Sequence, residues 1–168
     1  MISMAKEYFW SKVAGVLSNR HVVDWILRRD FPHYSSVVKD GVLYMDRWWV
    51  FNPVVGGKAK YKWLPSIRIN AIKKPDMDDA PHDHPWDARS IILRGGYIEE
   101  RTSLTGEVTH HGRGPGESYL IRHGEFHRIM RVPFDTVWTI FITYRYRGQW
   151  GFLSDGKKIP WRKYLGLE

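Results

Sequence analysis

Two segments of the sequence carry histidines with the spacing of metal ligands. His82 and His84 are two residues apart in PHDHPWDARSIILRGG, and on a strand this spacing directs both imidazoles to one face. His127 follows a glycine turn at residue 124 and is flanked by strand-forming residues, so it is well placed to face the first pair from another part of the fold. A lone histidine pair is common on protein surfaces, but the three residues together predict a divalent metal site.

The composition restricts the other chemistry that the chain can perform. Its 168 residues include no cysteine, so disulfides and thiolate metal sites are excluded, and a metal must be held by histidine or carboxylate. Aromatic residues make up 15% of the chain, which favours a β-rich protein with an apolar pocket. No apolar run approaches the roughly 20 residues that span a bilayer. We therefore expect a cytoplasmic protein without a membrane partner.

The net charge of +8 would attract anions, including nucleic acid. The basic residues are spread along the chain with no run longer than two. A soluble basic surface is therefore the favoured interpretation, and a nucleic-acid partner is the less favoured alternative.

The elements that must position the histidines differ between the two ends of the chain. Residues 3–29 have apolar residues at helical spacing, interrupted at Asn19, which predicts two short helices. From residue 41 onward, at least seven short runs of β-branched and aromatic residues alternate with Gly, Pro and Asn turns, which predicts a sandwich, jelly roll or small barrel. We interpret residues 1–168 as one domain, with a helical segment at 1–36, a β-barrel at 41–150 and a terminal hairpin at 151–168.

The two histidine segments resemble the paired motifs of the cupin superfamily. The first motif is matched by His82, His84 and the closing Gly95. The second motif is matched in spacing by Gly116, Arg122 (in the place of Pro), His123, Gly124 and His127. The resemblance implies a mainly all-β fold, a jelly-roll barrel of the double-stranded β-helix type, with the N-terminal helices packed on it. Dimers formed through barrel edges are frequent in the family, so the resemblance also implies a homodimer.

The sequence departs from the family at its usual acidic ligand. The register fixed by Gly95 places Ala88 where the family has Glu, with Asp87 beside it. Regular alternation would direct Asp87 away from the His82/His84 face, whereas a bulge at Pro85 would rotate it inward. Two sites therefore stay open: a three-histidine centre, and one with Asp87 as a fourth ligand. The opening Gly of the first motif and the closing Asn of the second are replaced by Asp76 and Arg131.

The resemblance to small three-histidine cupins of the cysteine-dioxygenase type implies a function. Three neutral imidazoles leave free coordination positions on Fe(II), which suits a mononuclear non-haem dioxygenase acting on a small, carboxylated substrate. A site with a carboxylate would also suit Mn, Ni or Zn. The alternative function is a non-catalytic module that binds a small anionic ligand, a sugar or a nucleotide. A metal-free, epimerase-like cupin with a histidine base is a third hypothesis.

Three further residues are candidates for substrate contacts. Arg68 would hold a substrate carboxylate if it enters the cavity, although its alternation with isoleucines slightly favours the solvent face. Arg94 shares the parity of His84 on a regular strand and would then need an anionic partner, either substrate, Glu99 or Asp87. Tyr119 would offer a phenolic hydroxyl to substrate, although such a residue is more often a packing residue.

The remaining aromatic and histidine residues have weaker signals. Trp86 and Trp138 would form pocket walls, but core packing is favoured for Trp138. His110 and His111 lie in a glycine-flanked hairpin and are expected to be exposed, while His123 competes with His127 as the second-motif ligand and is disfavoured by its motif position.

Overall fold

The protein's structure is a computed structural model that describes residues 4–168. Two helices begin the chain, α1 (Met4–Leu17) and α2 (Arg20–Leu27). The predicted interruption at Asn19 is present, because its side-chain oxygen accepts a hydrogen bond from the His21 amide and caps α2. Residue 3 of the predicted helical region lies outside the described residues.

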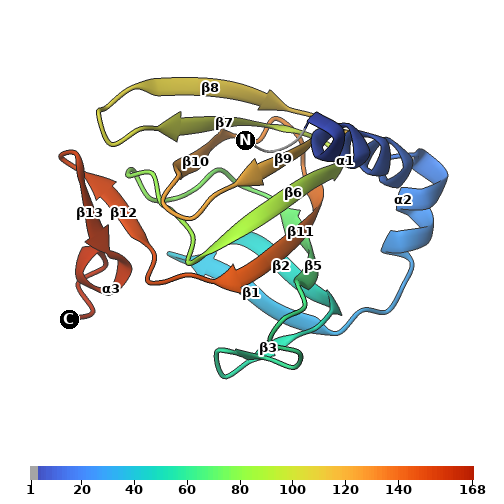
Figure 1. Cartoon of the computed structure of the whole chain (residues 1–168), viewed down its shortest axis with the longest axis horizontal. Coiled ribbons are helices and arrows are strands. Elements are labelled where there is room, and N and C mark those ends of the chain that lie inside the picture. Colours follow the sequence, from blue (N-terminus) through green and yellow to red (C-terminus); the bar gives the residue numbers. More distant parts are fainter. Residues whose placement is uncertain (1–3) are drawn as a thin grey trace.

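The strands form two main sheets (Figure 1). The larger sheet has the order β1-β2-β5-β11-β6-β9 and is antiparallel throughout. Its strands are β1 (His33–Lys39), β2 (Val42–Phe51), β5 (Ser66–Ile72), β11 (Val137–Tyr146), β6 (Trp86–Arg94) and β9 (Ser118–Ile121). The smaller sheet has the order β10-β7-β8, from β10 (Phe126–Arg131), β7 (Tyr97–Thr102) and β8 (Val108–Arg113). The prediction of a β-barrel with N-terminal helices is confirmed.

Two hairpins complete the architecture. A short one, β3 (Val54–Val55) and β4 (Lys58–Ala59), projects between β2 and β5. The terminal hairpin is β12 (Gly151–Ser154) with β13 (Lys157–Pro160), and the helix α3 (Trp161–Tyr164) follows it. The sequence predicted this hairpin but not α3. The prediction of a helical segment to residue 36 is wrong at its end, because β1 begins at His33.

Strand alternation separates two apolar cores. Ile91 and Leu93 of β6 face outward and pack with Ala14 and Val23 of the two helices. Ile92, on the same strand, faces the interior, where it joins a second core with aromatic residues of β7, β9 and β11. The helices therefore cover the outer face of the large sheet, and the interior between the sheets stays available for a site.

The histidine segment is held in the barrel wall by backbone pairing. The amide of His82 donates to the carbonyl of His127 at 2.9 Å, and the amide of His127 donates to the carbonyl of His82 at 2.9 Å. His82 also bridges to Phe152 of β12. Since directly opposed residues of an antiparallel pair place their side chains on one face, this pairing brings His82 and His127 together.

Asp83, between the two motif histidines, points away from them and anchors the terminal hairpin. Its side chain is fully buried, and its carboxylate accepts from the Gly151 amide at 2.7 Å and from Lys158 Nζ at 2.5 Å. The Asp83 amide in turn donates to the Gly151 carbonyl. Side-chain alternation along His82-Asp83-His84 therefore directs the two imidazoles into the barrel and the carboxylate toward the terminal hairpin.

We predict that Lys158→Ala lowers the free energy of unfolding by about 2–4 kcal/mol, because it leaves the buried Asp83 carboxylate without a cation. Lys157→Ala, one residue away on β13 and exposed without an ion pair among residues 4–168, is the matched control and should change it by less than about 0.5 kcal/mol. Urea denaturation measures both. Equal stabilities of the two variants would contradict the anchoring role of Asp83.

Candidate metal centre

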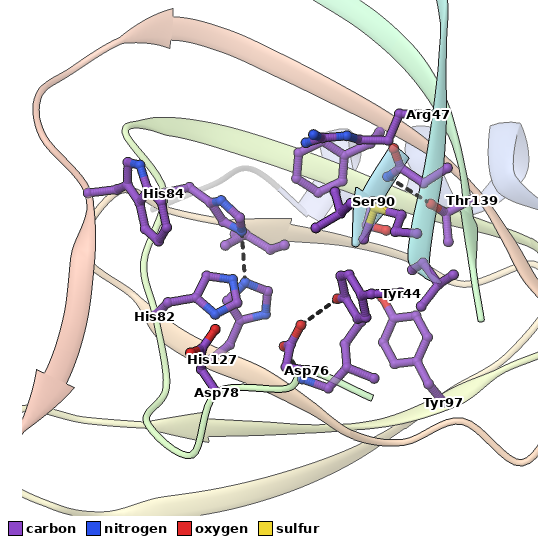
Figure 2. A pocket seen from close by; sticks show the side chains of 18 of the residues that line it. Tyr44, Arg47, Asp76, Asp78, His82, His84, Ser90, Tyr97, His127 and Thr139 are labelled. Carbon is purple, nitrogen blue, oxygen red and sulfur yellow. Dashed lines mark hydrogen bonds between the residues drawn. The ribbon is translucent and has the colours of Figure 1, made fainter. Parts of the chain in front are cut away.

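Three imidazoles converge inside the barrel (Figure 2). His84 Nε2 lies 2.9 Å from His127 Nε2, and one ring nitrogen of each of His82, His84 and His127 lies within 4.8 Å of the others. The ring centroids are 5.0 to 5.2 Å apart. The structure therefore brings together the three histidines that the sequence singled out.

Burial keeps two of these imidazoles neutral. It lowers the pKa of His84 well below the ordinary value of 6.5, with a further lowering by His127 and His82. Burial likewise lowers the pKa of His82, against the opposing charge of Asp76. Since a metal ion binds the neutral form of imidazole, the environment selects the protonation state that a metal needs.

Glu99 lies directly behind His127. Its Oε1 is 2.9 Å from His127 Nδ1, and its side chain is fully buried. Burial would raise the pKa of Glu99, but the hydrogen bond and charge of His127, with the charges of Arg101 and Arg113, lower it to about 2. A carboxylate accepting from Nδ1–H leaves Nε2 free as the metal-binding atom and raises its basicity.

Sequence reasoning missed this role of Glu99. It entered only as a candidate partner of Arg94, whereas it accepts from Arg113 Nε at 2.8 Å and from Arg113 Nη2 at 2.6 Å. The pairing of β10 with β7 places Ile129 opposite Glu99 and His127 opposite Arg101, so Glu99 and His127 are diagonal neighbours on one face. The available signal was the alternation Tyr97, Glu99, Arg101, which puts a carboxylate on an inward face.

The donor set fits a single divalent ion. Imidazole nitrogens bind zinc and similar ions at about 2.0–2.1 Å, so two ligands at right angles lie about 3 Å apart. The separation of 2.9 Å between the Nε2 atoms of His84 and His127 matches this value. His127 is buried, while His82 and His84 are partly accessible, so the cluster is reachable from one side.

Asp87 lies outside the cluster. Its carboxylate accepts from the His123 amide at 2.9 Å and from Arg147 Nη1 at 2.7 Å. Its direction is the one that regular alternation gives, so the structure holds a three-histidine cluster without this carboxylate.

Arg94 is also placed away from the histidines. It lies exposed at the end of β6 and forms an ion pair with Asp24 of α2. The expected shared parity with His84 fails because the pairing of β6 with β11 shifts register between Ile92 and Arg94.

A cavity of about 420 Å³ opens on the three histidines. Arg68 lines it and is buried, with 9% of its surface exposed. Its guanidinium lies 4.7 Å from the centroid of the Phe141 ring and makes no hydrogen bond or ion pair within residues 4–168. Burial and the nearby charge of Arg47 lower the pKa of Arg68 to about 9. The interpretation that favoured the solvent face for Arg68 is therefore wrong: Ile67 packs against the apolar core under the helices and Ile69 is buried, so neither face of β5 is exposed to solvent.

Three tyrosines offer hydroxyls at the cavity. Tyr119 is buried and its hydroxyl hydrogen-bonds to that of Tyr97, while Arg113 lies 3.9 Å from the centroid of the Tyr119 ring. Burial raises the pKa of both phenols, so both are protonated near neutral pH. The Tyr44 hydroxyl donates to Asp76, whose other carboxylate oxygen accepts from the Ile129 amide (Figure 2).

The remaining candidates divide between the cavity and the rest of the fold. Trp86 lines the cavity, whereas Trp138 packs in the core under the helices and stacks on Trp48. His110 is exposed and His111 half-buried on β8, and His123 lies outside the cluster.

The comparisons with known proteins support the fold. The sequence matches no protein-family model and no curated protein sequence. Among solved structures, it is similar to Fe(II)-HppE with the alternative substrate (S)-1-HPP, with 14% identity over 68% of this chain and a TM-score of 0.52. It is similar to the capsular polysaccharide assembling protein CapF from Staphylococcus aureus, with 12% identity over 84% of this chain and a TM-score of 0.52. It is also similar to oxalate decarboxylase from Lactobacillus farciminis, with 11% identity over 83% of this chain and a TM-score of 0.55.

These structures are cupin-fold proteins, and the fold of this chain is that of the cupins, as its paired motifs predicted. The chain spans 56%, 40% and 36% of the three proteins, so about half or less of each. Within the part of the chain that is described, no helix has the length and apolar character to cross a membrane.

We predict that Glu99→Gln weakens metal binding by about 10- to 100-fold, because the amide is a poorer acceptor for His127 Nδ1–H. Glu100→Gln is the matched control: Glu100 is also buried but pairs with Arg128 at 2.9 Å instead of with the cluster. Competition of each folded variant with a coloured chelator measures the affinity, with circular dichroism to verify folding. Equal affinities of the two variants would rule out an orienting role for Glu99.

Proposed function

We propose that this protein is a mononuclear non-haem Fe(II) dioxygenase that acts on a small substrate with an anionic group. The observation that carries the proposal is the combination, in one cavity, of three converging histidines with a buried arginine that has no partner among residues 4–168. His82, His84 and His127 would hold the ion and leave its other coordination positions to face the cavity. Mn, Ni and Zn are the alternative metals.

When bound, the ion would supply the redox and Lewis-acid chemistry that oxygen and substrate require. Side chains of the cavity would bind and orient the substrate. Arg68 would bind a carboxylate or similar anion through two parallel hydrogen bonds, and the pairing would neutralise a guanidinium that is otherwise buried alone. This fixes one end of the substrate, so that its other end faces the histidines.

Tyr119, which lines the same cavity, would also orient the substrate. Its hydroxyl shares a hydrogen bond with Tyr97, and both phenols keep their protons because burial raises their pKa. A protonated hydroxyl is a donor to a substrate oxygen and not a base. Arg94, paired with Asp24 outside the cavity, has no part in this arrangement.

A non-catalytic module for a small anionic ligand is the second candidate. Its support is the same unpaired Arg68, since an anion would bind there with or without a metal. The two functions separate on the binding of small carboxylates in the cavity of the three histidines: this binding depends on the loaded metal in the first function and survives chelation in the second.

We expect the protein loaded anaerobically with Fe(II) to bind nitric oxide, a stand-in for oxygen, and to show the electron paramagnetic resonance signal of a high-spin iron–nitrosyl centre. Adding small carboxylates should alter that signal, because the anion bound by Arg68 lies in the same cavity. Arg68→Gln should abolish the carboxylate effect and keep the nitrosyl signal, while Arg94→Gln should keep both. The proposal is wrong if the loaded wild-type protein gives no nitrosyl signal, or if His84→Ala gives an unchanged one.

A further inference from the structure

A second cavity, of about 920 Å³, adjoins the metal cavity. We call it the outer chamber. It lies beside the β3–β4 hairpin, which Figure 1 shows projecting from the large sheet below β2 and β5. Arg68 and Trp86 line both cavities. Along β5, Ser66 faces the outer chamber and Asn70 the metal cavity, so Arg68 stands at the boundary between them.

The charge of the outer chamber has one sign. Its lining includes Lys58, Lys62, Arg68 and Arg145, and among the residues that the structure describes no Asp or Glu lines it. None of these four cations forms an ion pair with a residue of 4–168, whereas most arginines elsewhere in the fold are paired, as Arg89 is with Glu7 at 2.6 Å. A concave surface of unpaired cations focuses a positive potential and attracts an anion.

Arg68 indicates that this anion is a ligand and not only the surrounding salt. An arginine with only 9% of its surface exposed normally has a carboxylate or a carbonyl as partner, yet the buried Nε of Arg68 makes no hydrogen bond within the described chain. The surrounding rings of Phe141 and Trp86 give it only cation–π contacts, at 4.7 and 5.9 Å.

The walls of the outer chamber are aromatic. Tyr34 and Trp49 lie with their ring centroids 4.6 Å apart, and Trp86, Tyr144 and Tyr146 complete the wall. Aromatic faces beside unpaired cations suit a ligand that joins a planar ring to an anionic group, because the ring stacks while the anion pairs.

The loop that carries two of the cations is held in place. Asn52 is buried at its base, donates to the carbonyls of Tyr61 and Leu64, and accepts from the Tyr61 amide at 2.8 Å. These bonds close the segment that includes Lys58 and Lys62. The two lysines are therefore presented from an anchored loop, which reduces the entropy lost when a ligand binds.

We propose that the outer chamber is a nucleotide-binding site, in which Lys58, Lys62 and Arg145 bind the phosphate, Arg68 forms the cationic floor, and Trp49, Tyr34 and Trp86 stack on the base. The site does not need the metal ion. The same chemistry is offered by a free nucleotide and by a nucleotide within a single strand, and the test separates these two sources.

The experiment is calorimetric titration of the full chain after chelator treatment, with adenosine monophosphate as the probe and with adenosine and ribose 5-phosphate as its fragments. The nucleotide should bind at least about 10-fold more tightly than either fragment, since ring and phosphate both contribute. The Lys58→Gln/Lys62→Gln double variant should weaken nucleotide binding by about 10-fold or more. The matched control, Lys6→Gln/Lys12→Gln on the exposed face of α1, removes the same charge and should leave binding unchanged.

Competition by a short single-stranded oligonucleotide identifies the source. An oligonucleotide that displaces the nucleotide and loses affinity in the Lys58/Lys62 variant assigns the site to a nucleotide within a strand, and one that does not displace it assigns the site to a free nucleotide. The proposal is overturned if the wild-type protein shows no saturable nucleotide binding at millimolar concentration, or if both lysine pairs weaken it equally. Because the titration contains no metal, its outcome is independent of whether the metal centre performs the proposed oxidation.

Discussion

The two backbone hydrogen bonds between His82 and His127 set the geometry on which the metal centre depends. They join a loop that precedes β6 to β10 in the other sheet, and so they cross the barrel at the point where the histidines meet. Because the two residues oppose each other directly, their imidazoles share one face, and His84 follows two residues later on the same face. Asp83 uses the opposite face to fasten the terminal hairpin, so the same tripeptide builds the site and ties down the chain's end.

The charges inside the barrel are distributed to match this geometry. Glu99 supplies a negative charge directly behind the cluster, and Arg101 and Arg113 hold its carboxylate in place. Imidazoles bind a metal ion in their neutral form, so an ion bound there would keep its positive charge toward the cavity. Arg68 stands on the other side without a carboxylate partner among residues 4–168. A substrate or ligand with a negative group completes this arrangement, which is why the proposals for both cavities involve anions.

Much of the fold and the heart of the site could be predicted from the sequence. Local patterns predict the three-histidine site and the barrel. These patterns are the alternation of His82 and His84, the glycine turn before His127 and the many short strands. The direction of Arg68 could not be predicted in the same way. Its strand is covered on both faces, so alternation with isoleucine no longer tells the interior from the exterior. The prediction that Arg94 shares the face of His84 fails for a related reason, since a register shift near the end of β6 breaks the alternation that links the two residues. The contact of Glu99 with His127 depends on the pairing of β7 with β10, which are far apart in the chain, so it could not be predicted from a local pattern.

The central claim is that His82, His84 and His127 bind one divalent ion while Glu99 acts from behind His127 and Asp87 takes no part. X-ray absorption spectroscopy of the Fe(II)-loaded protein tests it most directly, because multiple scattering from imidazole rings distinguishes histidine from carboxylate and water ligands. We predict three imidazole nitrogens at about 2.0–2.2 Å, with the remaining positions filled by light atoms that external ligands displace. The Asp87→Asn variant should give the same spectrum. Fewer than three imidazoles, or a spectrum that changes in Asp87→Asn, would contradict it.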